Sequence, residues 1–98
     1  MTRPLSFKRE AEADIEEAFA WYEARAEGLG AEFLQAVDAA LASIQRHPQG
    51  YQIVYRSMRR AVVHRFPYIV LYVVRAQDIA IVACVDSRRD PALWKARA

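Results

Sequence analysis

The apolar positions in the first half of the chain recur at helical spacing. Between about Glu10 and Glu27 they follow one another at steps of three and four, the period of one face of an α-helix. A second stretch of this kind runs from about Ala31 to Arg46, and that helix should end before Pro48 because proline disfavours helix at the preceding residue. Between them, Gly28-Leu29-Gly30 supplies residues that tolerate the left-handed conformation that ends a helix. The pattern predicts a helical hairpin.

After Pro48 the pattern becomes typical of β-strands. Strand-forming residues occupy 51–55, and three longer apolar runs follow at about 58–66, 68–75 and 78–86. The turns between these runs are short, so the runs should pair as an antiparallel meander. The last two are apolar at nearly every residue, which predicts central strands covered by the hairpin on one face and partly covered on the other.

Two short elements complete the predicted fold. A strand is expected around Leu5–Lys8, and a short helix around Asp90–Trp94 with Asp90 as its N-cap and Pro91 in its first turn. A chain of 98 residues can bury one core but not two, so we expect a single domain over residues 1–98. The expected class is α+β: an N-terminal strand and an antiparallel helical hairpin packed on a small, mostly antiparallel sheet, with a short C-terminal helix.

Charge is distributed unevenly along the chain. Residues 51–98 carry nine Lys or Arg and three Asp or Glu, a formal charge of +6, whereas residues 1–50 carry five and nine, a formal charge of −4. This asymmetry indicates a face that meets an anionic or acidic partner. The single cysteine, Cys84, lies in an apolar run and has no partner for an internal disulfide, which suggests the cytoplasm. The chain contains no apolar stretch long enough for a signal peptide or a membrane span.

The candidate chemistry centres on a histidine among arginines. On a regular strand Arg60 and His64 point to one face and Arg59 and Arg65 to the other. An imidazole beside guanidinium groups can cleave a phosphodiester without a metal, acting as acid or base while the cations hold the developing charge. The alternative is a histidine half-buried on a sheet beside surface arginines.

Other candidates have plainer interpretations. The carboxylates of Asp14, Glu16 and Glu17 are divided between helix faces, which favours a solvated surface over an acid/base pair. No histidine or cysteine spacing indicates a metal site, and no glycine-rich loop indicates a nucleotide, so no cofactor is expected. Arg88 and Arg89 either lie in a solvated loop or bind acidic side chains or phosphates. The packing interpretation is favoured for the remaining aromatic candidates, Trp21, Tyr22 and Trp94.

Several motifs together resemble the RelE/ParE superfamily of bacterial toxins. In the first half these are Asp14-Ile15-Glu16-Glu17-Ala18, Trp21-Tyr22-Glu23 and the Gly28-x-Gly30-x-x-Phe33 turn. In the second half the motifs that match are Ile44-x-x-x-Pro48, Tyr51, Arg59-Arg60, Arg65-Phe66-Pro67-Tyr68-x-Val70-x-Tyr72 and Arg88-Arg89-Asp90-Pro91-x-x-Trp94. Their order and spacing agree over nearly the whole chain.

The resemblance implies the toxin of a bacterial type II toxin–antitoxin pair, a class linked to growth inhibition and to plasmid or chromosome stabilisation. ParE-like members poison DNA gyrase, whereas RelE-like members cleave messenger RNA on the ribosome. The histidine that RelE-like members often place ahead of the Arg-Arg-Asp-Pro segment is replaced by Asp86, and no tyrosine follows Tyr72. This favours the ParE-like function. The alternatives are an endonuclease that would use His64, Arg65, Arg60 and Tyr68, and a non-toxic binding module.

The resemblance also implies a cognate partner, a ParD-like antitoxin with a ribbon-helix-helix half that binds operator DNA. We expect a hetero-oligomer in which an acidic, amphipathic antitoxin segment lies across the hairpin and the sheet. The predicted binding residues, for antitoxin or target, are Arg59, Arg60, Arg65, Arg88, Arg89 and Trp94, with Trp94 anchoring the tail that carries two of the arginines.

Overall fold

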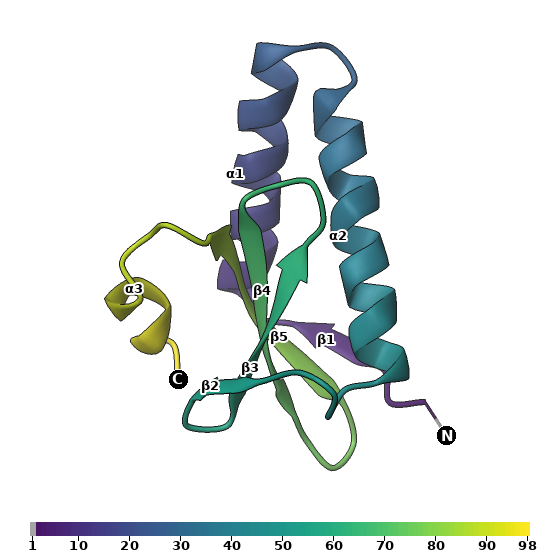
Figure 1. Cartoon of the computed structure of the whole chain (residues 1–98), viewed down its shortest axis with the longest axis vertical. Helices are drawn as coiled ribbons and strands as arrows, with labels where there is room; N and C mark the ends of the chain where they lie inside the picture. The colour runs from purple at the N-terminus through teal and green to yellow at the C-terminus, as the bar shows by residue number, and fades with distance from the viewer. Residues whose placement is uncertain (1) are drawn as a thin grey trace.

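The computed structural model describes residues 2–98, which form a helical hairpin beside a five-stranded sheet (Figure 1). The elements follow one another as β1 (Leu5–Phe7), α1 (Arg9–Arg25), α2 (Leu29–Arg46), β2 (Ile53–Tyr55), β3 (Met58–Val63), β4 (Tyr68–Val74), β5 (Ile79–Asp86) and α3 (Ala92–Lys95). The predicted α+β class is confirmed. Among these residues no helix has the length and apolar content that crossing a membrane requires.

The strands lie in the order β1-β5-β4-β3-β2, so the first strand of the chain pairs with the last. The strands β2 to β5 form the predicted antiparallel meander, whereas β1 runs parallel to β5 and pairs residues 5–7 with residues 79–81. A register shift in the β4–β5 ladder leaves Val82 as an extra residue, and Val82 and Ala83 both pack on the face opposite the hairpin. Such a bulge bends the strand locally.

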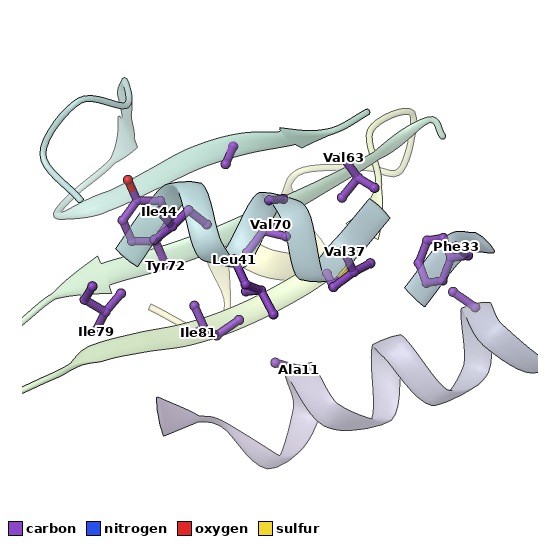
Figure 2. Packing of buried hydrophobic residues seen from close by; sticks show 14 residues of the cluster. Ala11, Phe33, Val37, Leu41, Ile44, Val63, Val70, Tyr72, Ile79 and Ile81 are labelled. Atoms are coloured by element: carbon purple, nitrogen blue, oxygen red, sulfur yellow. The ribbon is translucent and has the colours of Figure 1, made fainter. Parts of the chain in front are cut away.

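The main core lies between the hairpin and one face of the sheet (Figure 2). The second helix supplies an apolar stripe, and strands β3 to β5 supply the surface on which it packs. The labelled members are Ala11 of α1, Phe33, Val37, Leu41 and Ile44 of α2, and Val63, Val70, Tyr72, Ile79 and Ile81 of the sheet. Each fully buried side chain of this size contributes about 1.5–3 kcal/mol, so α2 anchors the hairpin.

A smaller apolar cluster covers the opposite face of the sheet. Trp94 of α3 is 7% exposed and packs there, so the short helix covers that face. The packing role and the partial cover that the sequence predicts are both confirmed. The carboxylate of Asp90 accepts a hydrogen bond from the Ala92 N–H at 3.0 Å, as its predicted capping role requires, although the helix begins at Ala92, after Pro91.

The turn between β3 and β4 differs from the prediction. The expected strand 58–66 ends at Val63, because Arg65 takes a left-handed conformation with φ of 74° and the chain turns there. This turn carries the Phe66 ring to 5.3 Å from the ring of Phe33, between centroids. His64 is exposed in the turn. The predicted strand face that Arg60 and His64 share is therefore wrong, and so is the half-buried histidine.

The turn between the helices confirms the predicted use of glycine. Gly28 has φ of 87°, a left-handed conformation. The Glu23 carboxylate accepts hydrogen bonds from the N–H groups of Gly28 at 3.0 Å and Gly30 at 2.9 Å. One side chain of α1 thus satisfies the exposed N–H groups at the start of α2.

Candidate binding groove beside the free edge of the sheet

The last strand extends beyond the strand that pairs with it. β1 reaches only residues 79–81, so within residues 2–98 the rest of β5 has no strand neighbour on that side. There the Asp14 carboxylate accepts a hydrogen bond from the Cys84 N–H at 3.0 Å, and Arg97 donates to the Val82 carbonyl at 3.3 Å. Arg97 also donates to both Asp14 oxygens, at 2.7 and 3.2 Å. Two side chains therefore satisfy backbone groups that an added strand would otherwise bind.

A groove of about 790 Å³ lies between α1 and this end of β5. One wall is a face of α1 that includes Asp14, Glu17, Ala18 and Trp21, whose spacing of three and four residues places them in one row. Trp21 is 50% exposed, so a large aromatic surface is open to a partner. The other wall consists of Tyr68, the end of β5 and the two arginines that follow it.

Tyr22 forms the centre of an aromatic cluster under the groove. Its ring centroid lies 5.0 Å from those of Trp21 and Phe66, 5.2 Å from Phe33 and 6.0 Å from Tyr68. Burial raises the pKa of Tyr22 and of Tyr68, and the neighbouring Asp86 carboxylate raises both further. Both phenols are therefore protonated at neutral pH and able to donate hydrogen bonds into the groove.

Three charged residues form the rim of the groove. The Arg88 guanidinium donates to the Asp86 carboxylate through Nε at 2.9 Å and Nη2 at 2.6 Å, and the Arg88 N–H donates to it at 2.8 Å. These side-chain hydrogen bonds lower the pKa of Asp86 to about 2. Arg89 makes no ion pair within residues 2–98. It is a rim cation whose charge is not neutralised locally.

The comparisons with known proteins agree with this architecture. The family model of the ParE toxin of the type II toxin–antitoxin system parDE matches residues 5–91. The chain belongs to the ParE toxin family. This membership confirms the predicted resemblance and implies a cognate antitoxin as partner. The matched range holds every residue of the groove, whereas Arg97 lies outside it.

A solved structure described as a chromosomal ParDE toxin–antitoxin system from P. aeruginosa has the same fold. Its TM-score is 0.74 over 86% of this chain and 95% of that chain, at 19% sequence identity. At this identity the likeness shows the fold alone. No curated protein matches the chain.

In this ParE-family toxin the predicted site residues are spread over the molecule. The Arg59 guanidinium donates to the carbonyls of Tyr51 at 2.6 Å and Gln49 at 3.2 Å, so it fixes the loop ahead of β2. Arg60 is exposed on the face of β3 opposite the hairpin, and Arg65 lies in the β3–β4 turn. Of the predicted set, only Tyr68, Arg88 and Arg89 line the groove. Trp94 is buried and holds α3 in place.

Four further residues shape the groove without having been predicted as site residues. The sequence assigned Trp21 and Tyr22 to packing, which is correct for Tyr22 but not for the half-exposed Trp21. The solvated surface predicted for the carboxylates is wrong for Asp14, whose side chain is 9% exposed and binds Arg97 and the Cys84 N–H. Asp86 was noted only as the residue in place of a histidine. The sequence feature that could have indicated the groove is the row of Asp14, Glu17 and Trp21 on one helix face, where carboxylates lie beside a large aromatic ring.

Proposed function

We propose that this toxin arrests growth by poisoning DNA gyrase in the cytoplasm, and that a ParD-like antitoxin neutralises it by occupying the groove. Membership of the ParE family supports the toxin role and the antitoxin partner. The observation that supports docking in the groove is the convergence of exposed Trp21, two protonated tyrosines and Arg89 on one hollow. The gyrase target is carried over from the family resemblance.

The groove fits an amphipathic segment with acidic residues. Ala18 and Trp21 offer apolar surface, while Arg89 and the tyrosine hydroxyls offer donors to carboxylates. Arg88 contributes less, because its guanidinium already binds Asp86. The hydrogen bond that Asp14 accepts from the Cys84 N–H of β5 favours a helical segment, since an added strand would have to displace it.

The docking proposal is tested by titrating the purified cognate antitoxin into toxin variants in a calorimeter. We expect Trp21→Ala to weaken binding at least about tenfold, because exposed aromatic anchors dominate interface energies. Arg89→Ala should weaken it less, and Arg60→Ala is the matched control on the far face of the sheet. Antitoxin affinity that is equal in Trp21→Ala and the native toxin would place the antitoxin elsewhere.

The target is tested with two assays on one preparation. The nuclease alternative gains no support from the geometry, because His64 lies in an exposed turn, Arg60 on the far face and Tyr68 in the groove. We therefore expect the toxin to inhibit supercoiling by gyrase and to leave messenger RNA on ribosomes intact. Unaffected supercoiling at saturating toxin would refute the gyrase target. Ribosome-dependent cleavage lost in His64→Ala would establish the nuclease, and inactivity in both assays a binding module.

A further inference from the structure

A second concentration of positive charge lies at the end of the sheet remote from the α1–α2 turn, the end that carries the β2–β3 turn and the β4–β5 turn (Figure 1). Two hollows of about 210 and 340 Å³ share Ser57 and Arg75 there. We call their six cationic residues the basic strip: Arg3, Lys8, Arg56, Arg59, Arg75 and Arg97.

No Asp or Glu side chain is among the described residues that line these hollows. Arg75 pairs with Asp78 at 2.6 Å and Arg97 with Asp14 at 2.7 Å. The other four cations have no carboxylate partner within residues 2–98. Lys8 and Arg56 are exposed, and the Asp78 carboxylate, which binds Arg75, also interacts with Lys8 through space.

One donor at the strip lacks a partner among the described residues. The Nε atom of Arg3 is buried and has no hydrogen-bond partner within residues 2–98. A buried donor of this kind costs free energy unless a ligand or water satisfies it.

We propose that the basic strip binds the phosphate backbone of duplex DNA, independently of sequence. Guanidinium groups pair with phosphate oxygens in bidentate fashion. No aromatic ring lines either hollow in the described chain, whereas single-stranded nucleic acid is held largely by bases stacked on such rings. This favours a duplex. The choice of DNA over duplex RNA rests on the proposed function, since gyrase holds duplex DNA.

The basic strip and the groove have no lining residue in common. The proposed DNA contact therefore uses other residues than the proposed antitoxin contact, although the two surfaces meet where Arg97 pairs with Asp14 at 2.7 Å. It gives a gyrase poison a second attachment, to the DNA that its target holds.

The test is fluorescence anisotropy of a short labelled DNA duplex with purified toxin over a range of salt concentrations. Four phosphate contacts predict a slope of log affinity against log salt of about −3 to −4. In the double variant Lys8→Gln/Arg56→Gln the slope should fall to about half that value and the affinity at least about tenfold.

The matched control is Arg46→Gln/Arg65→Gln, which removes the same charge from two exposed positions outside the basic strip. Arg65, like Arg56, occupies a turn with positive φ. The control should bind DNA as the native toxin does. Equal losses in the two double variants would overturn the proposal, because net charge alone would then explain the binding. Thermal melting of every variant verifies that each one is folded.

Competition experiments test the identity of the ligand. Unlabelled duplex DNA should displace the probe, and polyglutamate of equal charge should not. Tighter binding of an RNA duplex, or equal displacement by polyglutamate, would overturn the DNA assignment. The assay contains no gyrase, so a toxin that binds DNA without inhibiting gyrase contradicts only the proposed function. A toxin that inhibits gyrase without binding DNA contradicts only this inference.

Discussion

Asp14 is one of the two side chains that bind backbone groups on the free side of β5. Its side chain is only 9% exposed, and it accepts hydrogen bonds from the Cys84 N–H and from Arg97. An ion pair at this depth is weak evidence of net stabilisation, but loss of one partner leaves the other charge without compensation.

Replacement of Asp14 by Ala should therefore lower the free energy of unfolding by about 2–4 kcal/mol, because it leaves a backbone donor and a guanidinium unsatisfied. Asp14→Asn should cost less, since its amide oxygen still accepts from the Cys84 N–H. Urea unfolding measures both. Glu17→Ala, an exposed position on the same helix, is the control, and an equal effect of the two alanine variants would contradict this role of Asp14.

Acid should remove the contribution of Asp86. Its folded pKa of about 2 lies below the ordinary value of 3.8, so the carboxylate stabilises the fold above that ordinary value and the contribution is lost as the pH falls toward 2. The difference in stability between the native toxin and Asp86→Asn should shrink over this range. In Arg88→Ala the pKa of Asp86, followed by NMR titration, should rise toward its ordinary value; an unchanged pKa would exclude Arg88 as the cause.

At the scale of elements, α3 depends on one side chain. A helix of four residues does not persist alone in water, and Trp94 is its buried contact with the sheet. Trp94→Ala should cost about 3–5 kcal/mol and lower the melting temperature accordingly. Leu93→Ala, which removes a side chain that is 52% exposed from the same helix, should change it little. Similar melting temperatures for the two variants would mean that α3 does not stabilise the sheet.

The hairpin turn depends on Glu23 and on the absence of a side chain at Gly30. Glu23→Ala should destabilise the protein by about 1 kcal/mol, the usual cost of losing a helix cap. Gly30→Ala should cost more, because its Cβ would lie 2.8 Å from the Phe19 ring. Thermal melting compares them, and a neutral Gly30→Ala would show that the Phe19 ring moves aside freely.

The elements predicted correctly are those specified by short stretches of sequence. The spacing of apolar residues and the positions of glycine, proline and aspartate located both helices, the meander and the cap at Asp90, since each of these depends on neighbours along the chain. The end of β3 at Val63 was not predicted. The chain turns there so that the Phe66 ring packs in the aromatic cluster. The groove was missed for a related reason: its walls come from α1 and the end of β5, where Asp14 and Cys84 are 70 residues apart, and no local pattern pairs them.

At the scale of the whole molecule, the charge asymmetry of the sequence does not become a single basic face. The sequence predicted one basic face, whereas Arg89 lies at the groove and the basic strip at the other end of the sheet. The exposed outer positions of the hairpin carry most of the acidic residues, such as Glu12, Glu16 and Glu27.

Because the groove and the basic strip have no lining residue in common, the toxin should retain its affinity for duplex DNA when the groove is occupied. A peptide with the sequence of the antitoxin's toxin-binding segment, which lacks the antitoxin's own DNA-binding half, allows this measurement by anisotropy. We expect unchanged affinity for the labelled duplex at saturating peptide. Displacement of the duplex by the peptide would show that the surfaces overlap.

The pairing of β1 with β5 also sets the order of events during synthesis. The chain emerges from the ribosome N-terminus first, so the helical hairpin is available early, whereas β1 waits for residues 79–81. One wall of the groove, with Tyr68, Asp86 and the two arginines, is complete only after those late residues emerge. A nascent toxin therefore lacks a complete groove until Arg89 has emerged, and an antitoxin that binds there, as we propose, meets only chains that have passed that point.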